Sequence, residues 1–249
     1  MIRELFNNIL ETGKYPIEWA TLLITPIHKK GSTSDPNNYR GISLLPCLAK
    51  FFSSILQRRI LDWALKKNIF SKGQLGFLPG NRTSDALIIL HNLIDKYCHK
   101  NGKVIHACFI DFQKAFDTIP RDRLLNKLLN LGLHGKVFQL IKSMYTGDET
   151  RIKVGSAMTD PIDINQGVRQ GCILSPLLFN LFLSDFEESL DQFEEYHPKV
   201  DATTRIPCIL WADDIIILSE TKTGLQAQLN ALETYCKSNS LTINTDKTK

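Results

Sequence analysis

The sequence predicts an α+β fold, because short runs of β-branched residues are separated by longer amphipathic stretches along its 249 residues. Three apolar runs, at 104–110, 206–210 and 215–218, have the composition of strands. The stretches at 46–67 and 83–100 repeat their apolar residues with helical spacing. The last two strands are separated by so few residues that they should pair as a hairpin.

Composition excludes several classes of protein. The chain is 43% hydrophobic and 22% charged, as in soluble globular proteins, and no apolar run is long enough to cross a bilayer. Its first ten residues do not resemble a signal peptide. None of the six cysteines forms a Cys-x-x-Cys pair, which argues against a zinc site and favours a reducing, intracellular compartment.

Charge is distributed unevenly along the chain. The net charge is +4, but residues 1–110 carry +8 and residues 111–249 carry −4. A basic first half is suited to contact phosphates. Chance asymmetry of a solvated surface explains the same numbers equally well, so charge alone selects no partner.

Two adjacent carboxylates, Asp213 and Asp214, lie between the last two apolar runs. Like charges side by side are unfavourable unless a cation neutralises them, and oxygen ligands favour a hard ion such as magnesium. The alternative is a solvated turn that happens to contain two aspartates, since turns favour this residue.

A third carboxylate follows the strand predicted at 104–110, which reads as buried on both faces. Asp111 comes directly after this run, and a carboxylate at the end of a buried strand needs a partner. It is therefore the natural third ligand for the predicted cation. Asp117, a few residues on, could simply favour the start of a helix.

The first hundred residues also contain a candidate phosphate-binding loop. A strand at 22–27 contains Pro26, which suggests a sheet edge. The polar loop at 28–40 then offers Lys29 and Arg40, which suit a triphosphate or a nucleic-acid backbone. Most such loops are merely solvated. Thr83 or Ser84 should cap the helix that follows, with Leu87 on its inward face.

The second half predicts further elements, which complete the α+β pattern. Gln170 and the Gly171 backbone lie in a glycine-rich loop that could face a nucleotide or be an ordinary tight loop. The other expectations are helices at 120–131, 136–145 and 175–190, with Ser175 as N-cap; a hairpin of 151–154 with 162–164; a surface excursion at 185–201; a capping box at 223–226; and a strand at 241–244.

Taken together and in this order, the segments resemble reverse transcriptases of non-LTR (LINE-type) retrotransposons. Residues 109–117, 167–180, 212–214 and 241–247 look like the four catalytic motifs of that family. Upstream, Lys29–Gly31, Asn38–Leu45 and Gly76–Gly80 look like its fingers motifs. One short motif would carry little weight, but an ordered set covering almost the whole chain is specific.

The resemblance implies a right-hand polymerase architecture, with an antiparallel palm sheet backed by helices. Residues 1–103 would be mainly fingers and residues 104–249 mainly palm, within a single reverse transcriptase domain. The family's thumb and endonuclease would be missing, as in a fragment of a larger polyprotein. Gly41 stands where the family usually has proline after the motif arginine.

The resemblance also implies RNA-directed DNA polymerase chemistry with two magnesium ions, which manganese could replace. Asp111 and Asp213 would be the principal metal ligands, Asp214 would assist, and the backbone carbonyl of Phe112 would contribute. Lys247 would protonate the leaving pyrophosphate.

For the nucleotide, the resemblance implies that Lys29 and Arg40 contact the triphosphate and that Gln170 and Gly171 line the pocket. Phe116 occupies the position of the family's steric gate, whose ring leaves no room for a 2′-hydroxyl. The implied partners are an RNA template, a DNA primer and dNTPs, with no membrane, and the implied location is the nucleus and cytoplasm.

Two other functions compete with this reading. One is a truncated, catalytically silent nucleic-acid-binding relic of the same fold, against which the intact Asp111, Asp213, Asp214 and Phe116 argue. The other is an unrelated two-metal phosphodiesterase, which the Gln170–Pro176 stretch disfavours.

Overall fold

The computed structural model describes residues 1–146 and 149–249. The chain divides into two compact units, each built from two separate stretches of sequence. They are a first unit of Met1–Trp63 with Ile119–Leu178 and a second unit of Ala64–Thr118 with Phe179–Lys249. The predicted division into fingers and palm at residue 103 stays a prediction.

The first unit combines a mixed sheet with helices. Its helical elements are α1 (Ile2–Thr12), η1 (Ile17–Trp19), η2 (Pro36–Asn38), most of α2 (Cys47–Lys66), α5 (Arg121–Asn130), α6 (Gly135–Met144) and the start of α7 (Ser175–Phe182). Its strands are β1 (Leu22–His28), β2 (Tyr39–Leu44), β4 (Glu149–Val154), β5 (Ala157–Met158) and β6 (Ile162–Asp163).

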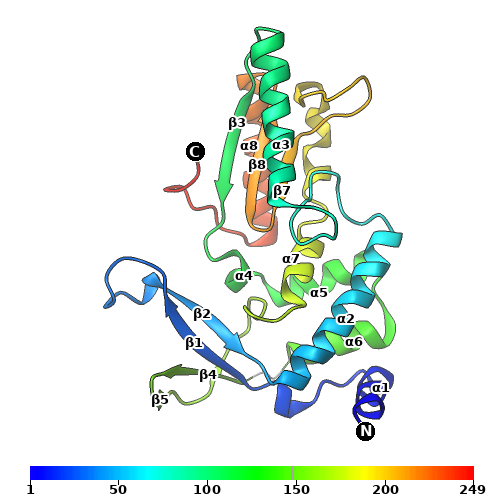
Figure 1. Cartoon of the computed structure of the whole chain (residues 1–249), viewed down its shortest axis with the longest axis vertical. Coiled ribbons are helices and arrows are strands. Elements are labelled where there is room, and N and C mark those ends of the chain that lie inside the picture. Colours follow the sequence, from blue (N-terminus) through cyan, green and yellow to red (C-terminus); the bar gives the residue numbers. More distant parts are fainter. Residues whose placement is uncertain (147–148) are drawn as a thin grey trace. The chain divides into compact units, whose positions relative to one another are not determined.

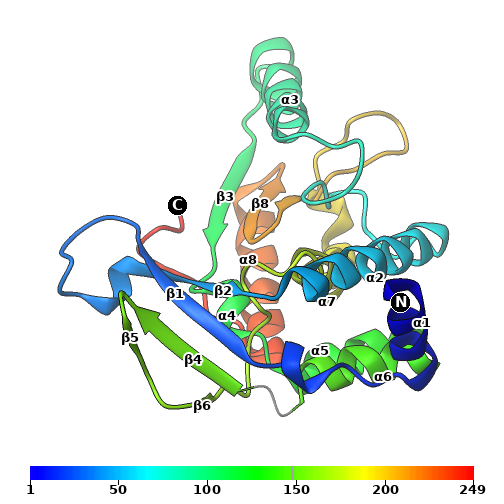
Figure 2. The same ribbon diagram turned by 60° about the horizontal axis from the view of Figure 1, so that its bottom comes forward.

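Strand β1 lies inside the sheet, between β2 and β4 (Figure 2). The prediction of an edge strand at 22–27 is therefore wrong for the strand as a whole. It holds locally at Pro26, because the parallel pairing with β4 extends only from Leu22 to Ile24. Pro26 pairs with Gly41 of β2. Because the Lys29 N–H donates to the Asn38 carbonyl, the alternation of antiparallel pairs makes 26/41 a pair without hydrogen bonds, and the missing N–H of proline costs no ladder bond there.

The predicted hairpin of 151–154 with 162–164 forms with a different register. After the turn at Gly155, β4 pairs first with the two residues of β5. Ile162 of β6 pairs farther back, with Thr150 near the start of β4. The tight turn at Gly155 makes β4 pair first with β5, which follows it directly. Strand β6 then pairs with the start of β4 in the same sheet.

The second unit is an antiparallel sheet with helices on both sides. Its strands are β3 (His106–Asp111), β7 (Cys208–Trp211) and β8 (Asp214–Ser219). Its helical elements are α3 (Thr83–Ile94), the π-helical η3 (Asp95–Lys100), α4 (Ala115–Thr118), the end of α7, the 3₁₀-type η4 (Glu187–Tyr196) and α8 (Lys222–Asn239).

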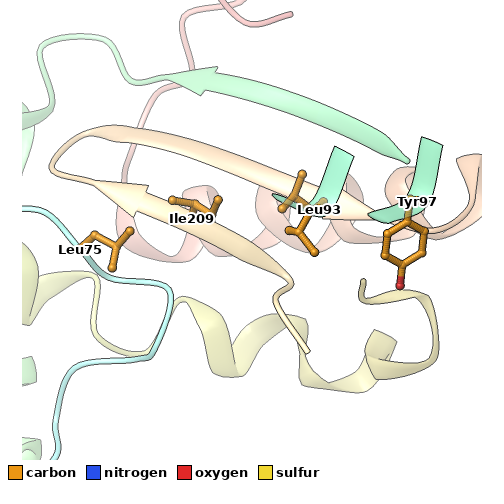
Figure 3. Close-up of a cluster of buried hydrophobic side chains, with 5 residues drawn as sticks. Leu75, Leu93, Tyr97 and Ile209 are labelled. Atoms are coloured by element: carbon orange, nitrogen blue, oxygen red, sulfur yellow. The ribbon is translucent and has the colours of Figure 1, made fainter. Parts of the chain in front are cut away.

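The β7–β8 pair confirms the predicted hairpin, and β8 also pairs with β3 in the order β3-β8-β7. Helices α3 and α8 cover opposite faces of this sheet (Figure 1). On the α3 face, Leu75, Ile209 of β7, Leu93 and Tyr97 belong to one cluster of buried side chains (Figure 3). This cluster packs against one face of the β7–β8 hairpin, so the hairpin is part of a packed core.

Strand β3 is half-buried, which corrects the prediction of a strand buried on both faces. Its burial alternates along the strand, and Phe109 is 48% exposed. The reason is its position at the edge of the sheet. Helix α8 contacts β3 and β8, whereas α3 contacts β7, and among the described residues of β3 the face that carries Phe109 is exposed.

The caps of two helices differ from the predicted ones, and one residue predicted to face inward is exposed. Arg82, rather than Thr83 or Ser84, is the N-cap of α3, and its N–H donates to the Asp85 carboxylate at 2.6 Å. Leu87, predicted to face inward, is 67% exposed. The cap of α8 is Thr221, two residues before the predicted capping box, and accepts from the Gly224 N–H at 2.9 Å.

Four predicted segments differ in extent or type. Helix α7 ends at Phe182 instead of 190, and Arg40 lies in β2 instead of a loop. The predicted surface excursion at 185–201 contains η4, which packs against α8 and buries Leu190. Residues 241–244 form no regular strand and contribute one isolated bridge, from Ile243 to Phe112. In the part of the chain that is described, every helix is too short or too polar to span a membrane.

Candidate active site

The hairpin turn of the second unit carries the two adjacent aspartates. Ala212 takes a left-handed conformation with φ of 59°, which reverses the chain after β7. Asp213 follows in the turn, and Asp214 is the first residue of β8. Asp214 is the register partner of Asp111, the last residue of β3. The fold therefore places the three aspartates predicted as metal ligands at the same end of the sheet.

Asp111 is held by two residues from the C-terminal segment. Lys247 Nζ lies 3.1 Å from Asp111 Oδ2, and the Asn244 side-chain amide donates to the same oxygen at 3.0 Å. The Asn244 backbone N–H also donates to the Asp111 carbonyl at 2.8 Å. Lys247, which was predicted to belong to the catalytic group, therefore lies beside Asp111. Its proton-donor role stays a prediction.

The electrostatics of this cluster favour a cation. Partial desolvation, followed by repulsion from Asp213 and then Asp111, raises the pKa of Asp214 above its ordinary value of 3.8, and Lys247 lowers it. Asp214 is nevertheless largely exposed to solvent. Mutual repulsion among carboxylates that share a site is the condition that a bound divalent cation relieves.

The donor chemistry of Asp111, Asp213 and Asp214 fits a hard divalent ion, because carboxylate oxygens are the ligands such ions prefer. Among residues 1–146 and 149–249, however, no three acidic, histidine or cysteine side chains are already gathered around one point. The Lys247 ammonium instead supplies the counter-charge to Asp111. Its side chain is 63% exposed, so it can leave the carboxylate without disturbing a core.

The raised pKa of Asp214 gives a stability prediction. At neutral pH its carboxylate is charged against repulsion, so Asp214→Asn should raise the free energy of unfolding of the metal-free protein. We expect a gain on the order of 0.5 kcal/mol, because solvent screens a group this exposed. The gain should disappear as the pH falls through the raised pKa toward 3.8, where the wild-type carboxyl also becomes neutral.

Urea unfolding at pH 7 and near pH 4, without divalent cations, measures this difference. Added magnesium should then stabilise the wild-type chain more than the variant. A variant whose stability tracks that of the wild-type chain at both pH values would show that Asp214 is not repelled by its neighbours.

Two further predicted residues belong to this unit. Phe112 forms an isolated bridge with Ile243. Its ring is buried, so a ligand could contact only its backbone. Phe116 lies in α4, and its half-buried ring stacks on Phe179 with centroids 4.7 Å apart and planes 17° apart. A stacked partner restricts the ring, as a steric gate requires.

The first unit holds the predicted triphosphate contacts, on the β1–β2 pair. Lys29 follows β1, and its backbone N–H donates to the Asn38 carbonyl at 2.8 Å. Arg40 of β2 pairs with Ile27 of β1. Both cationic side chains are exposed. Gly31, between the strands, has φ of 86°, and a Cβ there would stand 2.6 Å from the Asn38 amide.

The same pair of strands also receives the predicted nucleotide loop. The Gln170 carbonyl accepts from the Ser43 N–H of β2 at 2.7 Å. Gly171 has φ of 103°, and a Cβ there would lie 2.8 Å from the Ser43 carbonyl. Glycine is thus required for close approach to β2. In the first unit, Lys29, Arg40, Gln170 and Gly171 therefore all lie on or against β1 and β2.

Sequence reasoning assigned no role to two residues that contact the predicted machinery. Asn244 binds Asp111, and Phe179 stacks on Phe116. Both lie inside stretches that resemble family motifs, at 241–247 and 167–180, so their location was a signal. Their contacts join segments more than sixty residues apart, which no local pattern reports.

Comparison with known proteins identifies the family. The reverse transcriptase (RNA-dependent DNA polymerase) family matches residues 27–249. The chain belongs to this family. Catalysis with divalent metals is general among reverse transcriptases, which agrees with the carboxylate cluster of the second unit.

Similar proteins come from mobile elements, which confirms the resemblance to non-LTR retrotransposon reverse transcriptases. The probable RNA-directed DNA polymerase from transposon BS of Drosophila melanogaster is 31% identical over 98% of this chain. The Pol polyprotein from the type-1 retrotransposable element R2 of Nasonia vitripennis is 29% identical over 93%. This reverse transcriptase chain spans 27% and 22% of those two proteins, or about a quarter of their length.

The fold is that of right-hand polymerases, as predicted. The apo telomerase of Candida tropicalis truncated from its C-terminal domain superimposes with a TM-score of 0.68 at 16% identity, covering 93% of this chain and 50% of the telomerase. A second Candida tropicalis telomerase, solved with a fragment of telomeric RNA, gives a TM-score of 0.66. The α+β class and the antiparallel sheet backed by helices are confirmed.

Proposed function

We propose that this reverse transcriptase chain is the core of an RNA-directed DNA polymerase that adds dNTPs to a primer 3′-hydroxyl. One observation supports the proposal: the last residue of β3 and the turn of the β7–β8 hairpin place three aspartates at one end of the sheet, in a member of this family. A cluster of repelling carboxylates is unfavourable for stability alone and is explained by catalysis with a metal.

Asp111 and Asp213 would be the principal ligands of magnesium, with Asp214 and the Phe112 carbonyl assisting. Two divalent cations, magnesium or manganese, would supply activation of the primer 3′-hydroxyl and neutralise charge that develops at the α-phosphate. The residues of this chain would hold that centre at one end of the sheet, next to the packed core of the second unit. A rigid base under the carboxylates keeps them in one arrangement.

Lys247 would act as a proton donor to the leaving pyrophosphate. Its ammonium lies 3.1 Å from Asp111 Oδ2, so a protonated amine is already held beside the carboxylates. The long, largely exposed side chain is free to reorient toward an anionic group. A proton at Nζ would then pass to the pyrophosphate oxygen as the bond to the α-phosphate breaks.

The nucleotide would be contacted by two exposed cationic side chains and by the loop that contains Gln170 and Gly171. Lys29 and Arg40 are exposed on the β1–β2 pair and would bind the triphosphate. Gln170 and Gly171 would contribute backbone and amide groups to the nucleotide pocket. Phe116 would exclude the 2′-hydroxyl. The remaining partners would be an RNA template and a DNA primer, in the nucleus or cytoplasm.

One primer-extension reaction distinguishes this proposal from its two competitors. A 5′-labelled DNA primer annealed to an RNA template is incubated with the 249-residue chain, magnesium and dNTPs. Longer products support the polymerase. A primer that is retarded on a native gel but unchanged in length selects the catalytically silent binding relic, and a shortened primer selects a phosphodiesterase.

A further inference from the structure

A short segment of the second unit, Gly73–Gly76, runs along the outer edge of β7. The Leu75 N–H donates to the Leu210 carbonyl at 2.9 Å, and the Leu210 N–H donates to the Gly73 carbonyl at 2.8 Å. Gln74 forms an isolated parallel bridge with Leu210. Strand β7 leads directly into the turn that carries Asp213. The segment therefore holds the end of β7 just before the turn.

Gly76 brings this segment into direct contact with the turn. A Cβ on Gly76 would stand only 2.4 Å from the Ala212 nitrogen and 3.0 Å from the Trp211 carbonyl carbon. Real Cβ atoms do not come this close to backbone, so only glycine fits. Ala212 is also the residue with φ of 59°, immediately before Asp213. The backbone of Gly76 therefore packs against Ala212, the residue of the turn that has the left-handed conformation.

Two buried side chains hold Gly76 in place. The Asn180 amide in α7 donates to the Gly76 carbonyl at 2.7 Å, and the Gly76 N–H donates to Gln74 Oε1 at 3.0 Å. Asn180 is fully buried, and Gln74 is 5% exposed. Asn180 Oδ1 has no hydrogen-bond partner among the described residues. Burying an amide whose oxygen is unpaired is unfavourable, so the single hydrogen bond to Gly76 calls for a structural or functional reason.

We propose that Asn180 is a positioning residue for the aspartate pair. It fixes Gly76, Gly76 supports Ala212, and Ala212 sets the place of Asp213 and Asp214. Asn180, Gly76 and Ala212 are not themselves proposed ligands of the metal or the nucleotide, so Asn180 would act only through the position of the aspartates. The functional part of the inference rests on the proposed polymerase activity, whereas the mechanical part, a turn held by Asn180, stands on the contacts alone.

A purely structural Asn180 would also destabilise the protein when removed, so stability alone does not test the proposal. Asn239 provides the matched control. It is a buried asparagine of the same unit, and its side-chain amide likewise donates one hydrogen bond to a backbone carbonyl, that of Tyr235 at 3.0 Å. Its bond lies inside α8 and does not reach the turn.

The first measurement is hydrogen exchange in the 249-residue chain. Asn180→Ala should speed exchange of peptides covering residues 209–215 by roughly tenfold or more, because the local support of the turn is lost. Asn239→Ala should leave those peptides at the wild-type rate. Equal exchange of this segment in Asn180→Ala and in the wild-type chain would overturn the proposal.

The second measurement is steady-state dNTP incorporation with a magnesium titration. Asn180→Ala should lower kcat roughly 10- to 100-fold, as small displacements of catalytic groups do, and should need more magnesium, with little change in the KM for dNTP. Asn239→Ala should retain the wild-type magnesium dependence. If both variants lose activity only in proportion to unfolded protein, Asn180 is structural and the proposal fails.

Gln74→Met keeps the test decisive should Asn180→Ala not fold. It removes the other side-chain partner of Gly76 from a different segment and should reproduce both effects. A wild-type chain without synthesis would refute the proposed polymerase and the functional part of this inference with it. The exchange comparison would still decide whether Asn180 holds the turn, so the two failures are distinguishable.

Discussion

Replacing Asp111 with asparagine should lower primer-dependent dNTP incorporation by roughly 1,000-fold or more, a rise of about 4 kcal/mol in the barrier. Asparagine keeps the shape of the side chain but not the charge that would bind a divalent cation. It also removes the ion pair with Lys247, which is 63% exposed and therefore contributes little to stability. We expect catalysis to be lost while the fold persists.

The measurement is single-turnover incorporation alongside urea unfolding. Asp62→Asn, an exposed carboxylate on α2, is the matched control and should behave as the wild-type chain. If Asp111→Asn loses its cooperative unfolding transition, Asp111 serves stability. If Asp111→Asn incorporates dNTPs at the wild-type rate, Asp111 is not a metal ligand.

Replacing Phe116 with valine should reduce the preference for dNTPs over rNTPs roughly 100-fold in kcat/KM, or about 3 kcal/mol of discrimination. The ring stacks on Phe179, which holds it in one orientation. Valine is too small to fill the space that the ring occupies, so a 2′-hydroxyl would be admitted. Incorporation of dNTPs should change much less than that of rNTPs.

Parallel kcat/KM measurements with dTTP and UTP test this assignment. Phe109→Val is the matched control, because it makes the same change at a ring that is 48% exposed on β3. The control should keep the wild-type preference. An unchanged preference in Phe116→Val would remove Phe116 from the role of steric gate.

The sequence was sufficient to predict the hairpin that carries the aspartates. The two flanking runs are short and rich in β-branched residues, and two residues of strong turn preference lie between them. Asp111 could be predicted as the third ligand, because a carboxylate directly after an apolar strand needs a partner. These are local signals, and the structure pairs Asp111 with Asp214 in register.

What the sequence could not give depends on distant contacts. A nearly continuous apolar run predicted a fully buried β3, but its edge position leaves Phe109 exposed. The alternation at 241–244 predicted a strand, whereas Asn244 binds Asp111 there, and Lys247 binds it three residues farther on. The bond from Asn180 to Gly76 joins residues 104 positions apart, so no periodicity could reveal it.

The most direct test of the central claim is magnesium-dependent incorporation of labelled dTTP on an oligo(dT)-primed poly(rA) template. The wild-type chain and Asp213→Ala are compared in the same reaction, with equal folding of both verified by circular dichroism. We predict incorporation by the wild-type chain and its loss in Asp213→Ala or on chelation of magnesium. Incorporation that persists in Asp213→Ala would contradict a catalytic centre built on the three aspartates.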